Sequence, residues 1–570
     1  MRSALAFAIV LAACSSPRPT LALTTTAEAS RYLKTGRYDE AERLCRDFAR
    51  VYDGVTCNRI GITGEGRDIV ALAIAKRKNL PVIYIQAGIH AGEIEGKDAG
   101  FWFLRDVLDG KLLPGVLDKV SIVFVPVMSP DGHERFRANN RPNQRGPEEM
   151  GWRTNATRLN LNRDFVKADA PETQAVLSLI DEYKPVLLVD LHCTNGAKFE
   201  QDISVSVTPV APRGDQLDET AAALSKSLMA RLTQLGHLPV WFYPSFVDEE
   251  DPLSGFAIGE APPRFSHFYM AARSRLAVLV ETHSWRTYKE RAQSTYHALQ
   301  AVFENAAVHA GAWRDVQRAA DAADEKLAGT AVTLVWGNGP GKHELEFRGY
   351  AFEKKTSDLT GGSWLIYDES KPQIWKVPIY DEIVPKVTVT APARGYIIDG
   401  GYAALVAPLL EAHGLRWEYL EAGTPERVEV FRATKVTFAP APYEGRTRAT
   451  VEGAWKPETR ALTEGAVFVP IAQPGARLVM HLFEPSLPDS LVAWGMFNTA
   501  FERKEYMEPY VIEEEARELL AADPSLRAQF DAAVAADPAL AASVDAKRDW
   551  FYKRHPAWDE RVDLVPVYRR

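Results

Sequence analysis

The sequence predicts an α/β fold, in which a mixed, largely parallel sheet is flanked by helices and followed by an α+β accessory domain. Three apolar runs of strand length, at 82–85, 186–191 and 276–280, are separated by stretches in which apolar residues recur at helical spacing. Alternating strands and helices are typical of a parallel sheet with helices on its faces. A polar side chain that can bind a metal or catalyse a reaction follows each run.

Length and composition indicate a multidomain, soluble globular protein. The chain has 570 residues, with 46% hydrophobic and 25% charged residues. We expect a signal and tether at 1–30, an α/β domain at 31–328 and the accessory domain at 329–570. The formal net charge of −9 and the lack of a basic cluster argue against a nucleic-acid partner.

The N-terminus reads as an export signal. Arg2 precedes an apolar run at 4–13 that is too short to span a bilayer. The run ends in Leu-Ala-Ala-Cys at Cys14 and resembles a bacterial lipoprotein signal, which implies membrane attachment through a lipidated Cys14. The alternative is cleavage at the small residues 27–29. Either route places the mature protein in the cell envelope, as a periplasmic or outer-membrane protein, or outside the cell.

The remaining cysteines leave two alternatives open. An oxidising compartment permits a disulfide between Cys45 and Cys57, whereas the other interpretation is that all three remaining thiols are free. Cys193 follows His192 directly, so strand alternation points it to the opposite face. We therefore interpret Cys193 as a packing residue.

Periodicity and breakers predict the remaining elements. In the first half, helices are expected at 39–52, 99–108, 172–183 and 304–327, and strands at 70–75 and 122–127 as well as in the three apolar runs. In the second half, strands are expected at 332–336, 364–367, 387–389, 427–438 and 466–483, a strand–helix–strand unit at 395–419, and helices at 512–553. The second half shows no metal or nucleophile motif, so its expected role is to brace the first half or shape its cleft.

His90 and Glu93 form the first candidate metal site. Residues three apart share one face of a helical turn, and an imidazole and a carboxylate placed in this way can chelate zinc. The alternative is an exposed histidine near a surface glutamate. Proteins with parallel sheets bind their ligands at the carboxyl ends of the strands, and His192 and Glu281 also lie at such ends. We therefore predict that these four side chains converge on one zinc ion.

The stretch 35–296 resembles the zinc carboxypeptidases of the carboxypeptidase A type. The motifs that carry the resemblance occur in the family's order, and their joint order is specific. They are Gly61–Ile69, His90-x-x-Glu93, Pro130-Asp131-Gly132, Trp152-Arg153, Asn162-Arg163, His192 and Glu281.

The resemblance implies a role for each matching residue. The metal ligands would be His90, Glu93 and His192, the catalytic residues Glu281 and Arg153, and the clamp for a terminal carboxylate Asn162 and Arg163. The implied partner is a peptide substrate with a free C-terminal carboxylate. The alternative for Arg163 is an internal ion pair with Asp164 or Asp190.

The sequence departs from the family pattern at two points. Asn160 occupies a position at which the family commonly has an aspartate that supports a zinc-bound histidine; Asp190, on the strand face of His192, is a substitute. The family's mobile active-site tyrosine has no clear match, and Tyr269 is the nearest candidate before Glu281.

These observations predict an exported zinc metallocarboxypeptidase, in which a zinc-activated water and a glutamate base hydrolyse C-terminal peptide bonds. One alternative is a zinc amidase or endopeptidase that acts on cell-wall peptides or N-acyl amino acids. Another is a non-catalytic binding module with the same fold. The intact set of ligands and base argues against a binding module.

Overall fold

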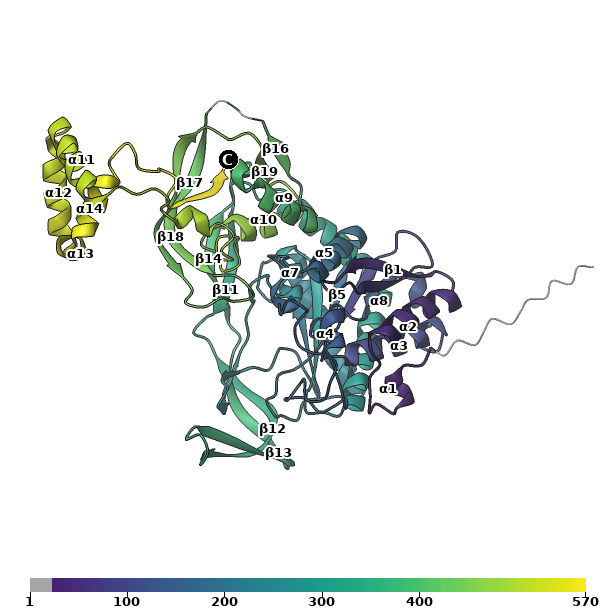
Figure 1. Cartoon of the computed structure of the whole chain (residues 1–570). Helices are drawn as coiled ribbons and strands as arrows, with labels where there is room; N and C mark the ends of the chain where they lie inside the picture. The colour runs from purple at the N-terminus through teal and green to yellow at the C-terminus, as the bar shows by residue number, and fades with distance from the viewer. Residues whose placement is uncertain (1–22, 422, 424) are drawn as a thin grey trace, which may run out of the picture.

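The computed structural model describes residues 23–421, 423 and 425–570 (Figure 1). Cys14 and the predicted signal lie outside these residues. The first half of the chain is built on an eight-stranded sheet with the order β1-β2-β4-β3-β5-β10-β6-β7. Its strands are β1 (Val55–Ile62), β2 (Asp68–Ile74), β3 (Val82–Ala87), β4 (Ser121–Val125), β5 (Leu187–Cys193), β6 (Ile203–Thr208), β7 (Pro239–Val240) and β10 (Leu276–Thr282).

The centre of this sheet is parallel and its flanks are mixed. Strands β4, β3, β5 and β10 run parallel to one another, whereas β1, β2 and β6 pair antiparallel with their inner neighbours. The central strands are apolar and buried on both faces, as parallel strands covered by helices require. The predicted mixed, largely parallel sheet is confirmed.

Helices cover both faces of the sheet. One face packs against α2 (Tyr38–Val51), α3 (Glu95–Leu108), α6 (Gln216–Gln234) and α8 (Tyr288–Asp324), and the other against α5 (Pro171–Tyr183) and α7 (Ser266–Ala272). Helix α8 begins well before the predicted residue 304. Thr287 and Glu290 form a capping box at its start, which satisfies backbone N–H groups that the first turn leaves free.

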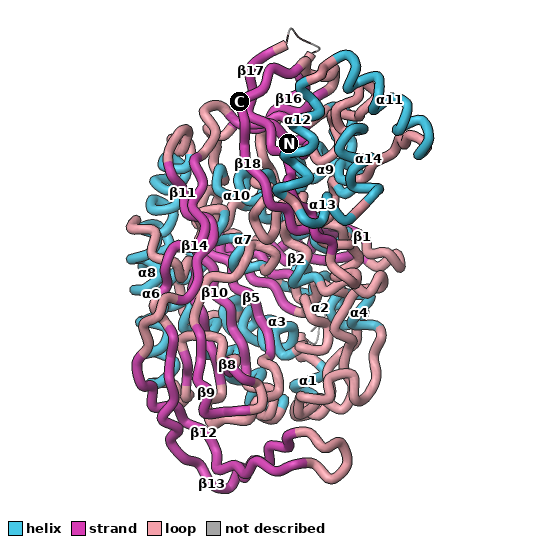
Figure 2. The backbone as a smooth tube through the Cα atoms, turned by 90° about the vertical axis from the view of Figure 1, so that its left-hand side faces the viewer, coloured by secondary structure: helices cyan, strands magenta, loops and turns pink. Residues whose placement is uncertain are grey.

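The second half contains sheets and helices, as predicted for an α+β domain. A hairpin of β12 and β13 extends the sheet formed by β8 and β9, and a six-stranded sheet has the order β16-β19-β15-β20-β17-β18 (Figure 2). Strands β8 (Phe246–Asp248) and β9 (Asp251–Ala257) belong to the first half. The strands of the second half are β11 (Ala331–Asn338), β12 (His343–Thr356), β13 (Ser363–Tyr380), β14 (Ile383–Thr390), β15 (Gly395–Ile398), β16 (Glu418–Leu420), β17 (Glu426–Phe438), β18 (Ala449–Arg460), β19 (Ala466–Pro470) and β20 (Leu564–Arg569). The helices are α9 (Ala403–Ala412), α10 (Ala476–Phe483), α11 (Pro509–Ala522), α12 (Ser525–Ala536), α13 (Pro538–Ala542) and α14 (Val544–Tyr552).

One predicted strand differs in the structure. The stretch 466–483, predicted as a strand, forms strand β19 followed by helix α10. The residue before the helix, Gly475, adopts a left-handed backbone conformation. Helices α11–α14 form a cluster that projects away from the rest of the molecule (Figure 1). No helix within the described residues has the length and apolar character to cross a membrane. The boundary between 328 and 329 stays a prediction.

The six-stranded sheet and helices α9 and α10 share a hydrophobic core with the α5/α7 face of the first half. Side chains such as Val479 and Trp494 belong to the same buried cluster as Tyr269 and Leu188. The second half therefore closes one face of the sheet that carries the predicted site.

Part of the predicted tether is folded. Within the expected tether, Thr26–Ala29 form the short helix α1, in which Ala27 is fully buried. The Glu28 carboxylate accepts a hydrogen bond from Arg105 at 2.9 Å. Cys45 and Cys57 form a disulfide, and Cys193 is a buried free thiol.

Candidate active site

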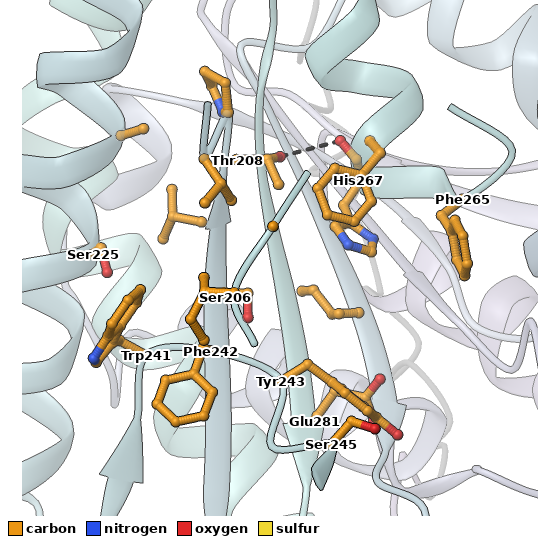
Figure 3. A pocket seen from close by; sticks show the side chains of 18 of the residues that line it. Ser206, Thr208, Ser225, Trp241, Phe242, Tyr243, Ser245, Phe265, His267 and Glu281 are labelled. Atoms are coloured by element: carbon orange, nitrogen blue, oxygen red, sulfur yellow. Dashed lines mark hydrogen bonds between the residues drawn. The ribbon is translucent and has the colours of Figure 1, made fainter. Parts of the chain in front are cut away.

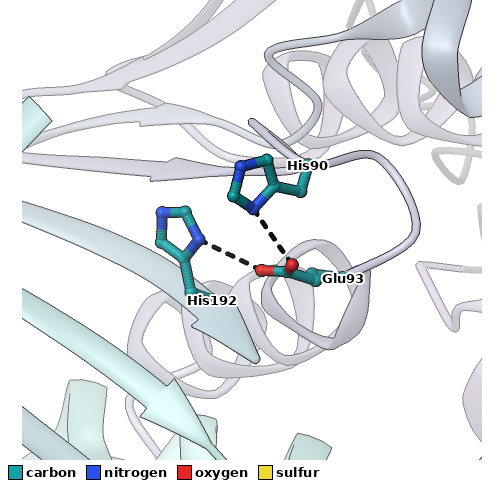
Figure 4. Close-up of side chains that lie close together, drawn as sticks. All are labelled: His90, Glu93 and His192. Atoms are coloured by element: carbon teal, nitrogen blue, oxygen red, sulfur yellow. Dashed lines mark hydrogen bonds and ion pairs between the residues drawn. The ribbon is translucent and has the colours of Figure 1, made fainter. Parts of the chain in front are cut away.

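Three predicted ligands meet at the carboxyl ends of β3 and β5. After β3 the chain turns at Gly88, whose φ of +65° favours glycine, and His90 and Glu93 follow in one tight turn. His90 Nδ1 lies 3.0 Å from Glu93 Oε1, and His192 Nδ1 lies 3.1 Å from Glu93 Oε2 (Figure 4). All three side chains are buried. The alternative of an exposed histidine near a surface glutamate is therefore wrong, and the structure brings the three predicted metal ligands together.

The outer nitrogens of both histidines have partners behind the cluster. His90 Nε2 lies 2.9 Å from Asn160 Oδ1, and His192 Nε2 lies 3.0 Å from Asp190 Oδ2. Such contacts fix the tautomer and the orientation of a metal-binding imidazole. Asn160 thus takes the place of the expected aspartate, and Asp190 supports the second histidine, so Nδ1 of each ring faces the cluster.

The charge states differ between the two histidines. Burial lowers the pKa of His90 to about 4 and so favours its neutral form. Burial also acts to lower the pKa of His192, but the Asp190 carboxylate outweighs it and the net pKa lies above the ordinary range. An imidazole must be neutral to bind a metal, so metal binding at His192 releases a proton.

Glu93 is held as a carboxylate by groups behind the cluster. Arg141 Nη2 donates to Oε1 at 2.6 Å, and the Cys193 N–H donates to Oε2 at 3.1 Å. Burial disfavours the charged form, but His90 and Arg141 outweigh it and hold the pKa of Glu93 well below its usual range. The fold therefore keeps Glu93 in the ionised form that binds a metal.

Glu281 stands beside the cluster on the neighbouring strand. It pairs in register with His192 across β10 and β5, which places both side chains on one face of the sheet. Burial raises the pKa of Glu281 to about 8, and its Oε2 is buried with no hydrogen-bond partner among the described residues. This is the environment of a carboxyl group that exchanges protons near neutral pH.

Two arginines and an asparagine face the same space. Arg153 Nη1 lies 3.6 Å from Glu93 Oε1. The Arg163 guanidinium stacks over the Phe265 ring at 4.1 Å and donates to the Asn162 carbonyl. Within the described chain Arg163 forms no ion pair with Asp164 or Asp190, so the alternative of an internal pair is wrong.

A cavity of about 940 Å³ joins these residues. Its volume lies within the range of small-molecule sites. Residues from β10, from β6, from α6, from the first turn of α7 and from the loops around 241–245 and 258–265 line it (Figure 3). The catalytic candidates that line it are His90, Glu93, Arg153, Asn162, Arg163 and Glu281.

The candidate tyrosine lies elsewhere. Tyr269 is fully buried, and its hydroxyl lies 2.9 Å from Nδ1 of His413, outside the cavity. Tyr243 instead lines the cavity near Glu281 (Figure 3), and its hydroxyl accepts a hydrogen bond from the Asn195 N–H at 3.2 Å. Sequence reasoning missed Tyr243 and Arg141, because both lie in loops whose path no motif predicts.

The residues present fit a zinc ion. One ligand atom from each of His90, Glu93 and His192 lies within 4.8 Å of the others. Two imidazoles and one carboxylate form a donor set of catalytic zinc sites, which leave a position open. The two Nδ1 atoms, each beside an oxygen of Glu93, face this space, and Glu281 lines the same cavity.

Comparisons with known proteins agree with this geometry. The family model for zinc carboxypeptidase matches residues 41–197. Carboxypeptidase 2 of Trichophyton tonsurans is 21% identical over 428 residues, which cover 73% of each chain. Carboxypeptidase A4 of Mus musculus is 33% identical over 110 residues, or 18% of this chain and 26% of that protein.

Among solved structures, the carboxypeptidase A of Helicoverpa armigera matches with 15% identity and a TM-score of 0.38, covering 49% of this chain and 75% of that one. The family match spans the turn with His90 and Glu93, the clamp residues and His192. We conclude that residues 41–197 match the zinc carboxypeptidase family and that this match, together with the metal cluster, supports a zinc metallocarboxypeptidase.

Proposed function

We propose that the protein is an exported enzyme that removes C-terminal residues from peptides, with Glu281 as its general base. The observation that carries the proposal is the presence in one cavity of the metal cluster, the buried Glu281 and the Arg163 guanidinium, which has no carboxylate partner among the described residues. A metal site beside a proton acceptor suits hydrolysis. An arginine without a carboxylate partner suits a substrate that supplies one.

Zinc, held by His90, Glu93 and His192, would supply a Lewis acid that polarises the scissile carbonyl and makes water acidic enough to attack near neutral pH. Glu281 accepts the proton of the attacking water on its unpaired carboxylate oxygen and passes it to the leaving amine. Arg153, beside the cluster, offers N–H donors to the carbonyl oxygen as negative charge develops there.

The terminal carboxylate of the substrate binds at the clamp. Arg163 presents a planar fork that matches a carboxylate through two parallel hydrogen bonds, and stacking on Phe265 limits its rotation. The Asn162 side chain accepts a hydrogen bond from the Ser266 N–H at 3.1 Å, which ties the clamp to helix α7. The positions of the clamp and the metal cluster therefore determine which peptide bond is cleaved.

Glu281→Gln tests the assignment of the base. The variant should retain zinc and lose at least about 10²-fold in kcat on a peptide with a free C-terminus, since a positioned base contributes about 10²–10⁴-fold. Glu219→Gln, the same change on the exposed surface of α6, is the matched control. A Glu281→Gln enzyme with nearly wild-type turnover would show that the base lies elsewhere.

The cellular address is a separate part of the proposal. Cleavage at residues 27–29 would remove Ala27 and Glu28, which pack against the fold. This packing supports processing before Cys14 with lipid attachment there. Mass spectrometry of the mature N-terminus should find an acylated Cys14, and an unmodified terminus near Ala29 would refute it.

A further inference from the structure

The cavity continues beyond the catalytic centre as an apolar compartment. Leu279 lies two residues before Glu281 on the same face of β10, and the strand register places Ser206 of β6 beside it. Aromatic and aliphatic side chains enclose this compartment (Figure 3). They are Phe242, Ile258, Phe265 and Phe268.

One polar side chain in this lining has no partner. His267 is only 5% exposed, yet neither of its ring nitrogens has a hydrogen-bond partner among the described residues, and Nδ1 is buried. Its ring lies 4.2 Å from the ring of Phe268, centroid to centroid. A buried polar group without a partner is costly and uncommon, so it calls for a ligand or a function.

The backbone around His267 is anchored, which fixes the point from which the imidazole enters the compartment. The Thr208 hydroxyl of β6 donates to the His267 carbonyl at 3.1 Å (Figure 3). The preceding Ser266 donates its N–H to the Asn162 side chain and its hydroxyl to Asp190. The first turn of α7 is thus anchored both to the carboxylate clamp and to the strand beside the compartment.

We propose that His267 selects the side chain of the C-terminal residue of the substrate, and that it favours tyrosine over phenylalanine. The inference rests on the proposed exopeptidase function. With the terminal carboxylate at Arg163 and the scissile bond at the metal cluster, the terminal side chain enters the adjoining compartment. There an aromatic ring packs against apolar walls, and its hydroxyl meets the unpaired imidazole.

The charge of the compartment supports a neutral side chain. Burial lowers the pKa of His267 to about 3, so the ring is neutral at physiological pH and offers one donor and one acceptor to a hydroxyl. The carboxylates that line the cavity are Glu93 and Glu281 of the catalytic centre and Asp218 on α6. Among the described residues none of them forms a hydrogen bond or ion pair with His267, so a lysine side chain beside the imidazole has no carboxylate to pair with there.

The test compares kcat/KM for N-acylated tripeptides that differ only in a C-terminal tyrosine, phenylalanine or lysine. One net hydrogen bond predicts that the wild-type enzyme prefers tyrosine over phenylalanine by about 2- to 10-fold, with lysine poorest. His267→Leu should bring the tyrosine-to-phenylalanine ratio to about 1, whereas His267→Gln, which retains a neutral donor and acceptor, should keep it above 1. His309→Leu makes the same change on the exposed surface of α8 and should leave the ratio unchanged.

The outcomes separate this inference from the proposed function. Cleavage of none of the three peptides by the wild-type enzyme would refute the exopeptidase function. Cleavage of all three with a ratio of 1, or with lysine best, would refute the role of His267 alone. The wild-type ratio decides the matter even if a variant at this position fails to fold, and a ratio that survives in a folded His267→Leu enzyme would also overturn the inference.

Discussion

Arg141 holds a metal ligand in place, so its removal should weaken zinc binding. Its guanidinium donates to Glu93 Oε1 at 2.6 Å, and its side chain is only 12% exposed. The chain has a glycine at 92 because a Cβ there would lie 2.6 Å from Cγ of Arg141 and 2.6 Å from the Gly151 carbonyl oxygen. We propose the variant Arg141→Met, which retains the length of the side chain and loses its charge and donors.

The expected size of the effect follows from these contacts. Without Arg141, Oε1 of Glu93 loses its shortest hydrogen bond and the carboxylate is less strongly held in its ionised form. Loss of a group that orients a metal ligand typically weakens metal affinity about 10- to 100-fold. This range corresponds to about 1.4–2.7 kcal/mol of binding free energy.

Competition with a chromophoric chelator measures zinc affinity independently of peptide hydrolysis. Arg145→Met is the matched control, because Arg145 lies in the same loop but pairs with Glu369 at 2.6 Å and is 45% exposed. The control should bind zinc like the wild-type enzyme. Unchanged or tighter zinc binding by a folded Arg141→Met protein would refute the reasoning.

Three further predictions concern the clamp, the second half of the chain and pH. Amidation of the peptide C-terminus should cost about 2–4 kcal/mol of transition-state stabilisation, measured as a fall in kcat/KM. Arg163→Ala should abolish this difference between free and amidated peptides. Equal cleavage of both peptides by the wild-type enzyme would exclude an exopeptidase. Glu444 accepts a hydrogen bond from the Asn160 N–H at 2.8 Å, and Asn160 supports His90. Glu444→Ala should therefore reduce kcat/KM about 10-fold, whereas Glu444→Gln, which keeps an acceptor, should not. Equal kcat/KM for Glu444→Ala and the wild-type enzyme would contradict this role. Burial lowers the pKa of His413 to about 4, so below pH 6.5 the unfolded state binds more protons than the folded state. As the pH drops from 6.5 to 4, this group should therefore lower the free energy of unfolding by about 3 kcal/mol. Denaturant titrations should show a smaller loss for His413→Gln, and an equal loss would refute the assignment.

The metal cluster can be predicted from the sequence alone because it depends only on one local turn and on the order of the strands. His90 and Glu93 share one turn, and His192 and Glu281 end neighbouring parallel strands. The carboxyl ends of parallel strands meet at one edge of a sheet, so the side chains converge whatever the loops do. The same argument predicted that Asp190 supports His192.

Other parts of the site depend on tertiary contacts that no motif reveals. Arg141 reaches Glu93 from a long polar loop, and Tyr243 lies in the connection after a two-residue strand. His267 is distinguished only by its lack of hydrogen-bond partners among the described residues, which is a tertiary property. Composition could indicate that these loops matter, but it could not place their side chains.

The errors in the second half have a similar cause. The apolar stretch 466–483 fits a buried strand as well as a buried helix, and periodicity cannot separate the two for short apolar segments. The expected elements also do not include strand β20. It contains Pro566, which has no backbone N–H to donate, yet β20 pairs with β15 and β17 on its two sides. Its place in the sheet follows from the packing of the whole domain.

Zinc content of the His192→Ala protein tests the central assignment most directly. Elemental analysis of the purified, folded protein should find one zinc ion per wild-type chain. Because His192 supplies one of three ligand atoms that lie within 4.8 Å of one another, the variant should retain less than about a tenth of that amount. Stoichiometric zinc in the His192→Ala protein would show that the metal is held elsewhere.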